Sequence, residues 1–140
     1  MPDTQLVVSS GRAPGAPVSI VFVDDEKDIV TVFTRFLERA GFHVTGFTEP
    51  MRALDYFMQN HERISLIITD LRMPQMDGIA LASGVRKISA DVKIILMTAF
   101  ETSGHTKEIH ELKISPILCK PISPANLKMI VDRTLGAASC

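Results

Sequence analysis

Five polar residues, each placed directly after a short apolar run, could together carry out metal-assisted phosphoryl transfer. Asp24 and Asp25 follow one run, while Asp70, Thr98 and Lys120 follow three others. Carboxylates held close together repel one another, and a hard divalent cation relieves that repulsion. Magnesium suits such a site, because it prefers oxygen ligands and commonly binds a couple of carboxylates together with a phosphate oxygen.

With a metal in place, a carboxylate can attack a phosphoryl donor and form an acyl phosphate. This transfer requires mainly that the reacting groups are positioned and that the negative charge on the three equatorial oxygens of the phosphoryl group is neutralised. Magnesium would contact one oxygen, the Lys120 ammonium a second and the Thr98 hydroxyl a third, and the small Ala99 would leave room beside them. Because no His or Cys joins the group, zinc is not expected.

The apolar runs before these residues predict strands buried on both faces, because apolar residues follow one another instead of alternating. The four runs are Val18 to Val23, Leu66 to Thr69, Val92 to Met97 and Pro116 to Cys119. His43 to Phe47 alternates in part and predicts an edge strand. A buried, structural role is expected for Cys119, since free cysteine packs as a small hydrophobe.

Helical spacing fills the segments between the predicted strands. It is clearest from Asp28 to Ala40, where apolar residues line one face and Gly41 follows at a C-cap position. Ser123 before Pro124 predicts the N-cap of a last helix that continues to Leu135. Further helices are expected at Ala53 to Asn60 and Ile79 to Ile88, with a short or mobile one within Thr102 to Leu112.

Five repeats of strand then helix predict an α/β fold, a doubly wound five-stranded parallel sheet with helices on both faces. In such a sheet, ligands bind beyond the carboxyl ends of the strands. The polar residues at the strand ends should therefore meet at one edge of the sheet and form one site.

Length and composition predict one globular domain. The chain has 140 residues, is 46% hydrophobic and 22% charged, and carries a net charge of -1, which gives no hint of a nucleic-acid or membrane surface. We expect a flexible tail over 1–17, a domain over 18–135 and a short tail over 136–140. No apolar run is long enough to cross a bilayer. The two cysteines form neither a metal spacing nor a disulfide framework, so a cytoplasmic location is expected.

Four segments together resemble the receiver domain of two-component response regulators, of the single-domain type found in bacterial chemotaxis. They are Val21 to Glu26, Ile67 to Gly78, Met97 to Phe100 and Cys119 to Pro121, in the family's order and spacing. The resemblance covers about residues 18 to 135 and implies a flavodoxin-like strand order 2-1-3-4-5. It also implies a phosphoacceptor switch, not an enzyme, that assists its own phosphorylation and dephosphorylation.

Carried over to this sequence, the resemblance implies that Asp70 accepts phosphate from a histidine kinase or a histidine phosphotransfer protein. It implies a magnesium site made by Asp25 and Asp70 directly, Asp24 largely through water, and the backbone carbonyl of Arg72. Thr98 and Lys120 would contact the phosphoryl group, and Lys120-Pro121 would be a cis peptide. The output would be phosphorylation-dependent protein binding or phosphorelay.

One position departs from the family pattern. Receiver domains usually have an aromatic residue three positions before the lysine, where this chain has Ile117. We therefore hypothesise that the signal travels through Phe100 and the weak helix after it. Two other readings stay open: a metal-dependent phosphatase with Asp24 as nucleophile, and a binding module that no longer needs phosphate.

Overall fold

Five parallel strands form one sheet in the order β2-β1-β3-β4-β5, as the pattern of apolar runs predicts. The computed structural model describes residues 18–99 and 102–136. The strands are β1 Ser19–Val23, β2 His43–Phe47, β3 Ile64–Asp70, β4 Lys93–Thr98 and β5 Ile117–Cys119. The strand order confirms the doubly wound, flavodoxin-like arrangement, with β2 and β5 at the two edges.

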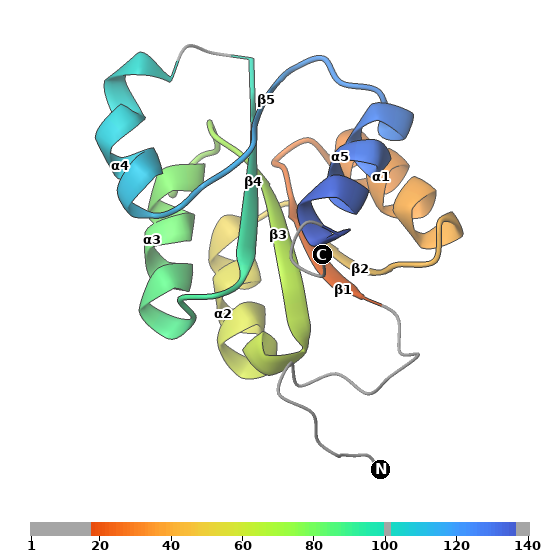
Figure 1. Ribbon diagram of the computed structural model, residues 1–140, viewed down its shortest axis with the longest axis horizontal. Helices are drawn as coiled ribbons and strands as arrows, with labels where there is room; N and C mark the ends of the chain where they lie inside the picture. Colours follow the sequence, from red (N-terminus) through yellow and green to blue (C-terminus); the bar gives the residue numbers. More distant parts are fainter. Residues whose placement is uncertain (1–17, 100–101, 137–140) are drawn as a thin grey trace.

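Helices cover both faces of this sheet. They are α1 Lys27–Arg39, α2 Pro50–Asn60, α3 Gly78–Ile88, α4 Thr106–Glu111 and α5 Pro124–Gly136, with 3₁₀ turns η1 His61–Arg63 and η2 Ser103–His105. Figure 1 shows α1 and α5 side by side on one face, and α2, α3 and α4 on the other. In the described part of the chain, no helix is long and apolar enough to cross a membrane.

Alternate residues of β1, β3 and β4 enter two separate cores, which explains the continuous apolar runs of these strands. In β1, Val21 and Val23 pack with the core beneath α2 and α3. Ile20 and Phe22 pack with the opposite core, where Phe33 of α1 stacks on Phe22 at 5.5 Å between ring centroids. The sheet is thus held from both sides, and its polar strand ends have a rigid support.

The predicted cap at Gly41 is confirmed. Gly41 has a φ of 104°, and its N–H donates to the carbonyl of Glu38, while the N–H of Phe42 donates to the carbonyl of Leu37. These two bonds form a Schellman motif, which a residue with a Cβ would strain because of the positive φ. They end α1 and direct the chain into β2.

The predicted start of the last helix is also confirmed. The backbone N–H of Asn126 donates to the Ser123 hydroxyl at 3.1 Å, and Pro124 is the first residue of α5. Ser123 is therefore the N-cap, and its short loop connects α5 directly to Lys120 and Pro121 at the end of β5.

The short helix expected between β4 and β5 is present, and a 3₁₀ turn that was not expected precedes it. The turn is η2 and the helix is α4, which has six residues and no buried side chain. Ile109 and Leu112 pack against the core only in part, which agrees with the sparse apolar pattern of this segment. Of the tail expected over 136–140, Gly136 is instead the last residue of α5. The rest of that tail, the tail expected over 1–17 and the hypothesis on Phe100 lie outside the described residues.

Candidate functional site

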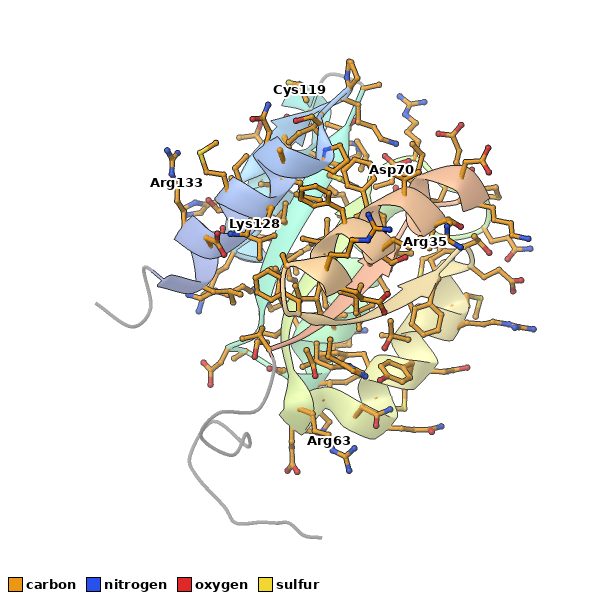
Figure 2. All side chains as sticks on the ribbon, turned by 90° about the vertical axis from the view of Figure 1, so that its right-hand side faces the viewer. Arg35, Arg63, Asp70, Cys119, Lys128 and Arg133 are labelled. Atoms are coloured by element: carbon orange, nitrogen blue, oxygen red, sulfur yellow. The ribbon has the colours of Figure 1, made fainter. Side chains whose placement is uncertain are left out.

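The sheet brings the predicted site residues to one edge. Asp70 and Thr98 are the last residues of β3 and β4, Asp24 follows β1, and Lys120 follows β5. Figure 2 labels Asp70 and Cys119 at the same end of the molecule, and Arg63, just before β3, at the other end. The parallel direction of the strands therefore gathers residues that are up to 96 positions apart in the sequence.

Three carboxylates form an acidic cluster at this edge. Oxygen atoms of Asp24, Asp25 and Asp70 lie within 4.8 Å of one another. Asp24 is fully buried, Asp70 is 8% exposed and Asp25 is exposed. The backbone N–H of Glu26 donates to Asp24 Oδ1 at 2.9 Å, and that of Leu71 donates to Asp70 Oδ1 at 2.9 Å. These bonds fix the orientation of the two buried carboxylates.

Lys120 supplies positive charge to the cluster. Its Nζ donates to Asp24 Oδ2 at 2.9 Å and lies 3.4 Å from Asp70 Oδ2. Burial alone would lower the pKa of Lys120, but the hydrogen bond to Asp24 and the charges of Asp24 and Asp70 raise it above its usual value. The ammonium is therefore held charged between the two carboxylates.

The positive charge of Lys120 does not fully offset the burial of Asp70 and the negative charge of Asp24 beside it. Burial raises the pKa of Asp70 above 3.8, and the negative charge of Asp24 raises it further, although Lys120 and the N–H of Leu71 act in the opposite direction. The charged form of Asp70 is thus disfavoured in the absence of a further cation.

The donor set fits magnesium. It offers three carboxylates with oxygens close enough to share an ion, and burial, followed by the negative charge of Asp24, raises the pKa of Asp70, so a cation would favour its charged form. Oxygen-only clusters of this kind select hard cations such as Mg²⁺ over zinc. The residues present at this edge of the sheet are therefore compatible with the magnesium that the sequence predicts.

The remaining predicted residues surround the cluster. Thr98 is buried at the end of β4, and its carbonyl accepts the N–H of Lys120 at 2.8 Å, which joins the last residues of β4 and β5. Arg72 is exposed, two residues after Asp70, and the small Ala99 is exposed next to Thr98. Each of these residues lies at the carboxyl edge of the sheet, where the sequence analysis expects it.

The loop after β3 is closely packed against the site. The Gly78 N–H donates to the carbonyl of Leu71 at 2.8 Å, and a Cβ at position 78 would overlap the backbone carbonyl oxygen of Asp70. Asp77 caps α3 by accepting the N–H of Ala80 at 2.8 Å. The loop thereby fixes the backbone of Asp70, and only glycine allows this close approach.

The end of β5 confirms one prediction and corrects another. The Lys120-Pro121 peptide is cis, as the family resemblance implies, and Ser115-Pro116 is a second cis peptide that the sequence analysis did not anticipate. Cys119 is exposed, so the prediction that it is buried is wrong. In this three-residue edge strand, Leu118 packs in the α1 and α5 core, whereas Cys119, the last residue of the strand, is exposed.

Ile117 packs in part against the core beneath α3, opposite Leu96 of β4. It is half-buried. This is the strand position at which the family pattern has an aromatic residue, and here it contributes an aliphatic contact to the core.

A mainly apolar cleft beside Asp70 was missed by the sequence analysis. Its volume is about 440 Å³, and its lining includes Asp70 and Lys120. The apolar part of the lining comes from α1, the end of β4 and the β5–α5 loop: Ile29, Phe33, Met97, Ala99, Pro121 and Ile122. Helical spacing shows that Ile29 and Phe33 face inward but cannot show that space remains beside them.

Known proteins of one family resemble this chain over most of its length. The family model described as the response regulator receiver domain matches residues 20–132. CpdR of Brucella abortus, a response regulator receiver protein, is 32% identical over 119 residues, which are 85% of this chain and 98% of that protein. The chain covers only 24% to 28% of two further relatives, both longer regulatory proteins.

Solved structures show the same fold. The chemotaxis protein CheY4 of Vibrio cholerae superposes with a TM-score of 0.78 and 25% identity, over 85% of this chain and 99% of that one. A receiver domain protein from Clostridium thermocellum gives a TM-score of 0.79 with 22% identity, over 87% and 97% of the two chains. This chain therefore belongs to the response regulator receiver family, the phosphoacceptor proteins of two-component signalling.

Proposed function

We propose that Asp70 is the residue that accepts the phosphoryl group. The observation that carries this proposal is that Asp70, alone among the three acids of the cluster, lines the described cleft. Asp24 is fully buried, with one oxygen bonded to the Glu26 N–H and the other to Lys120. This arrangement favours Asp70 over Asp24 as the nucleophile and argues against the phosphatase alternative.

We further propose that Asp24, Asp25 and Asp70, with the backbone carbonyl of Arg72, hold Mg²⁺. The close approach of the three carboxylates and the raised pKa of Asp70 support this assignment. When bound, the ion neutralises the acids and a phosphoryl oxygen, so that two anions can approach each other.

The chain's own groups complete the site. The ammonium of Lys120 lies 3.4 Å from Asp70 Oδ2 and would bind one phosphoryl oxygen as the group reaches Asp70. The hydroxyl of Thr98, one residue beyond the β4 residue paired with Asp70, would bind another. The same contacts would assist both phosphorylation and hydrolysis of the acyl phosphate, so the chain acts on its own modification.

The donor in this proposal is a histidine kinase or a histidine phosphotransfer protein, and the responding unit is a receiver domain over residues 18–135. Phosphorylation would change the affinity for a downstream protein, or the phosphoryl group would pass to another protein in a relay. The family membership of residues 20–132 supports both routes, and the identity of each partner is a matter for experiment.

Intact-mass measurement after incubation with acetyl phosphate and Mg²⁺ tests the phosphoacceptor proposal. The wild-type chain should gain the mass of one phosphoryl group, and Asp70→Asn should gain none. Asp55→Asn, which changes an exposed acid on α2, is the matched control and should behave as wild type. Chelation of Mg²⁺ with EDTA should abolish the gain in both phosphorylatable proteins.

Two results would contradict the proposal. Asp70→Asn could gain the phosphoryl mass as wild type does, which would assign the acceptor elsewhere. Alternatively, the chain could release inorganic phosphate from a stable phosphate monoester without forming an adduct, which would favour the phosphatase.

A further inference from the structure

The cleft beside Asp70 is continuous with the place where a phosphoryl group must bind. Asp70 and Lys120 belong to its lining, and so does Arg72. When the phosphoryl group of a donor approaches Asp70 beside Lys120, the remaining part of that donor can therefore enter the cleft. The residues that line the cleft should therefore influence which phosphodonors react.

The chemistry of the cleft favours an apolar ligand. Phe33 and Met97 are buried core residues, while Ile29 and Ile122 are half-buried. The charged members of the lining are the residues of the phosphoryl site and the exposed Glu26. The cleft thus combines a charged part, at Asp70 and Lys120, with an apolar part that offers no hydrogen bonds from side chains.

We propose that this cleft binds the leaving group of the phosphodonor, and that the chain prefers small acyl phosphates with an apolar acyl chain over acetyl phosphate. This inference rests on the proposed role of Asp70 and names the substrate class of the same site. The cleft volume of about 440 Å³ is many times the roughly 30 Å³ that one water molecule takes up in the liquid, so an acyl chain of four carbons has room there.

The reaction is balanced for any acyl phosphate. A carboxylate oxygen of Asp70 forms a bond to phosphorus, the bond between phosphorus and the acyl oxygen breaks, and the carboxylate leaves with the electron pair. No proton or further reactant is required. Lengthening the acyl chain changes the apolar surface buried in the cleft but hardly changes the basicity of the departing carboxylate.

A donor series tests the preference. Acetyl, propionyl and butyryl phosphate are compared with the wild-type chain in Mg²⁺, by the rate of gain of the phosphoryl mass at donor concentrations below saturation. Because burying one CH₂ strengthens binding by about threefold to fourfold, butyryl phosphate should react roughly fivefold faster than acetyl phosphate when the chain is partly buried. Equal rates, or rates that fall with chain length, would overturn the inference.

Variants connect the preference to the cleft. Ile122→Ser makes the cleft polar and Ile122→Phe fills it, so both should bring the butyryl-to-acetyl rate ratio close to one, while Ile122→Val should keep most of it. Val32→Ser is the matched control, because Val32 is 52% exposed on α1 and does not line the cleft. A ratio that persists in both Ile122→Ser and Ile122→Phe would contradict the assignment.

A binding measurement separates this inference from the proposed function, because it needs no phosphoryl transfer. Butylphosphonate and methylphosphonate are titrated into the chain with Mg²⁺, and the methyl resonances of Ile29, Met97 and Ile122 are followed by NMR. Butylphosphonate should shift these signals, methylphosphonate should shift them much less, and Val32 should stay unchanged. Identical responses to both phosphonates would overturn the inference. If these shifts were selective but Asp70 gained no phosphate, the proposed function would fail, while the binding of an apolar chain in the cleft would stand.

Discussion

Lys120 Nζ donates a 2.9 Å hydrogen bond to Asp24 Oδ2, from the end of β5 across the sheet edge to the end of β1. The same nitrogen lies 3.4 Å from Asp70 Oδ2. One ammonium therefore faces two buried carboxylates, and Asp25 adds a third acid to the cluster. Three acids therefore share one ammonium, and without a bound cation the site has an excess of negative charge.

Neutralising Asp70 should stabilise the metal-free chain. Burial and the charge of Asp24 raise the pKa of Asp70, so its charged form opposes folding at neutral pH. In EDTA, Asp70→Asn should raise the melting temperature by about 3 to 5 °C, the effect of roughly 1 kcal/mol in a domain of this size. Asp55→Asn should shift it far less, since surface substitutions are usually small in effect.

Magnesium should make the wild-type chain more stable than Asp70→Asn, the reverse of their order in EDTA. The wild-type chain should gain stability with Mg²⁺ concentration by mass action, and Asp70→Asn should gain less because it has lost one carboxylate of the cluster. Thermal unfolding over a Mg²⁺ titration measures both effects. Equal gains in the two proteins would place the ion away from Asp70.

The advantage of Asp70→Asn in EDTA should depend on pH. The unfolded carboxyl titrates near 3.8, and folded Asp70 keeps its proton to a higher pH. Stability therefore falls as the pH rises from 3.8 through the folded pKa, and no penalty exists below 3.8, where both states are protonated. Melting temperatures of the two proteins in EDTA should converge in acid and separate as the pH rises to 8. A constant difference would contradict this origin.

Removal of the ammonium should make the chain more dependent on magnesium. Lys120→Met leaves Asp24 fully buried without its cationic partner, which should cost about 1 to 3 kcal/mol in EDTA. Mg²⁺ should stabilise this variant more than wild type, because the ion and the ammonium neutralise the same acids. Lys120→Arg keeps the charge and should lose less. If Mg²⁺ stabilised Lys120→Met no more than wild type, the two cations would not act on one cluster.

The close approach at Gly78 should be essential for the site. In Gly78→Ala the new Cβ would overlap the Asp70 carbonyl oxygen and lie 2.9 Å from Leu96 Cδ1. Overpacking of this kind should cost about 1 to 3 kcal/mol and slow the gain of phosphoryl mass by displacing Asp70. Gly104→Ala meets no atom within 4 Å and should match wild type. If Gly78→Ala were as stable as wild type and were phosphorylated as fast, the loop after β3 would be able to move and make room for the Cβ, which would contradict this prediction.

The sequence predicts most of this fold because its strands are apolar on both faces. His43–Phe47 has the expected bounds, and other strands and helices differ by a few residues at their ends. Alternate residues such as Val21 and Phe22 enter different cores, which continuous apolar runs indicate directly. The segment before β5 has few apolar residues, and its division into η2 and α4 could not be predicted from them.

The site is predictable in its members but not in its contacts. Parallel strands bring their carboxyl ends together, so the convergence of Asp24, Asp70 and Lys120 follows from the order of elements. Lys120 Nζ lies nearer to Asp24 than to Asp70, and this difference depends on side-chain geometry that cannot be predicted from the positions of the residues in the sequence. The exposure of Cys119 has a similar cause, because an apolar neighbourhood in sequence does not show which face of an edge strand is covered.

Mapping of the modified residue tests the central claim most directly. Borohydride reduces an aspartyl phosphate to homoserine, and mass spectrometry of peptides from the chain treated with acetyl phosphate and Mg²⁺ locates the product. We expect homoserine at position 70 and unmodified aspartate at Asp24 and Asp25. Homoserine at either of those two positions, or a phosphoryl group on a histidine in place of an acyl phosphate, would contradict it.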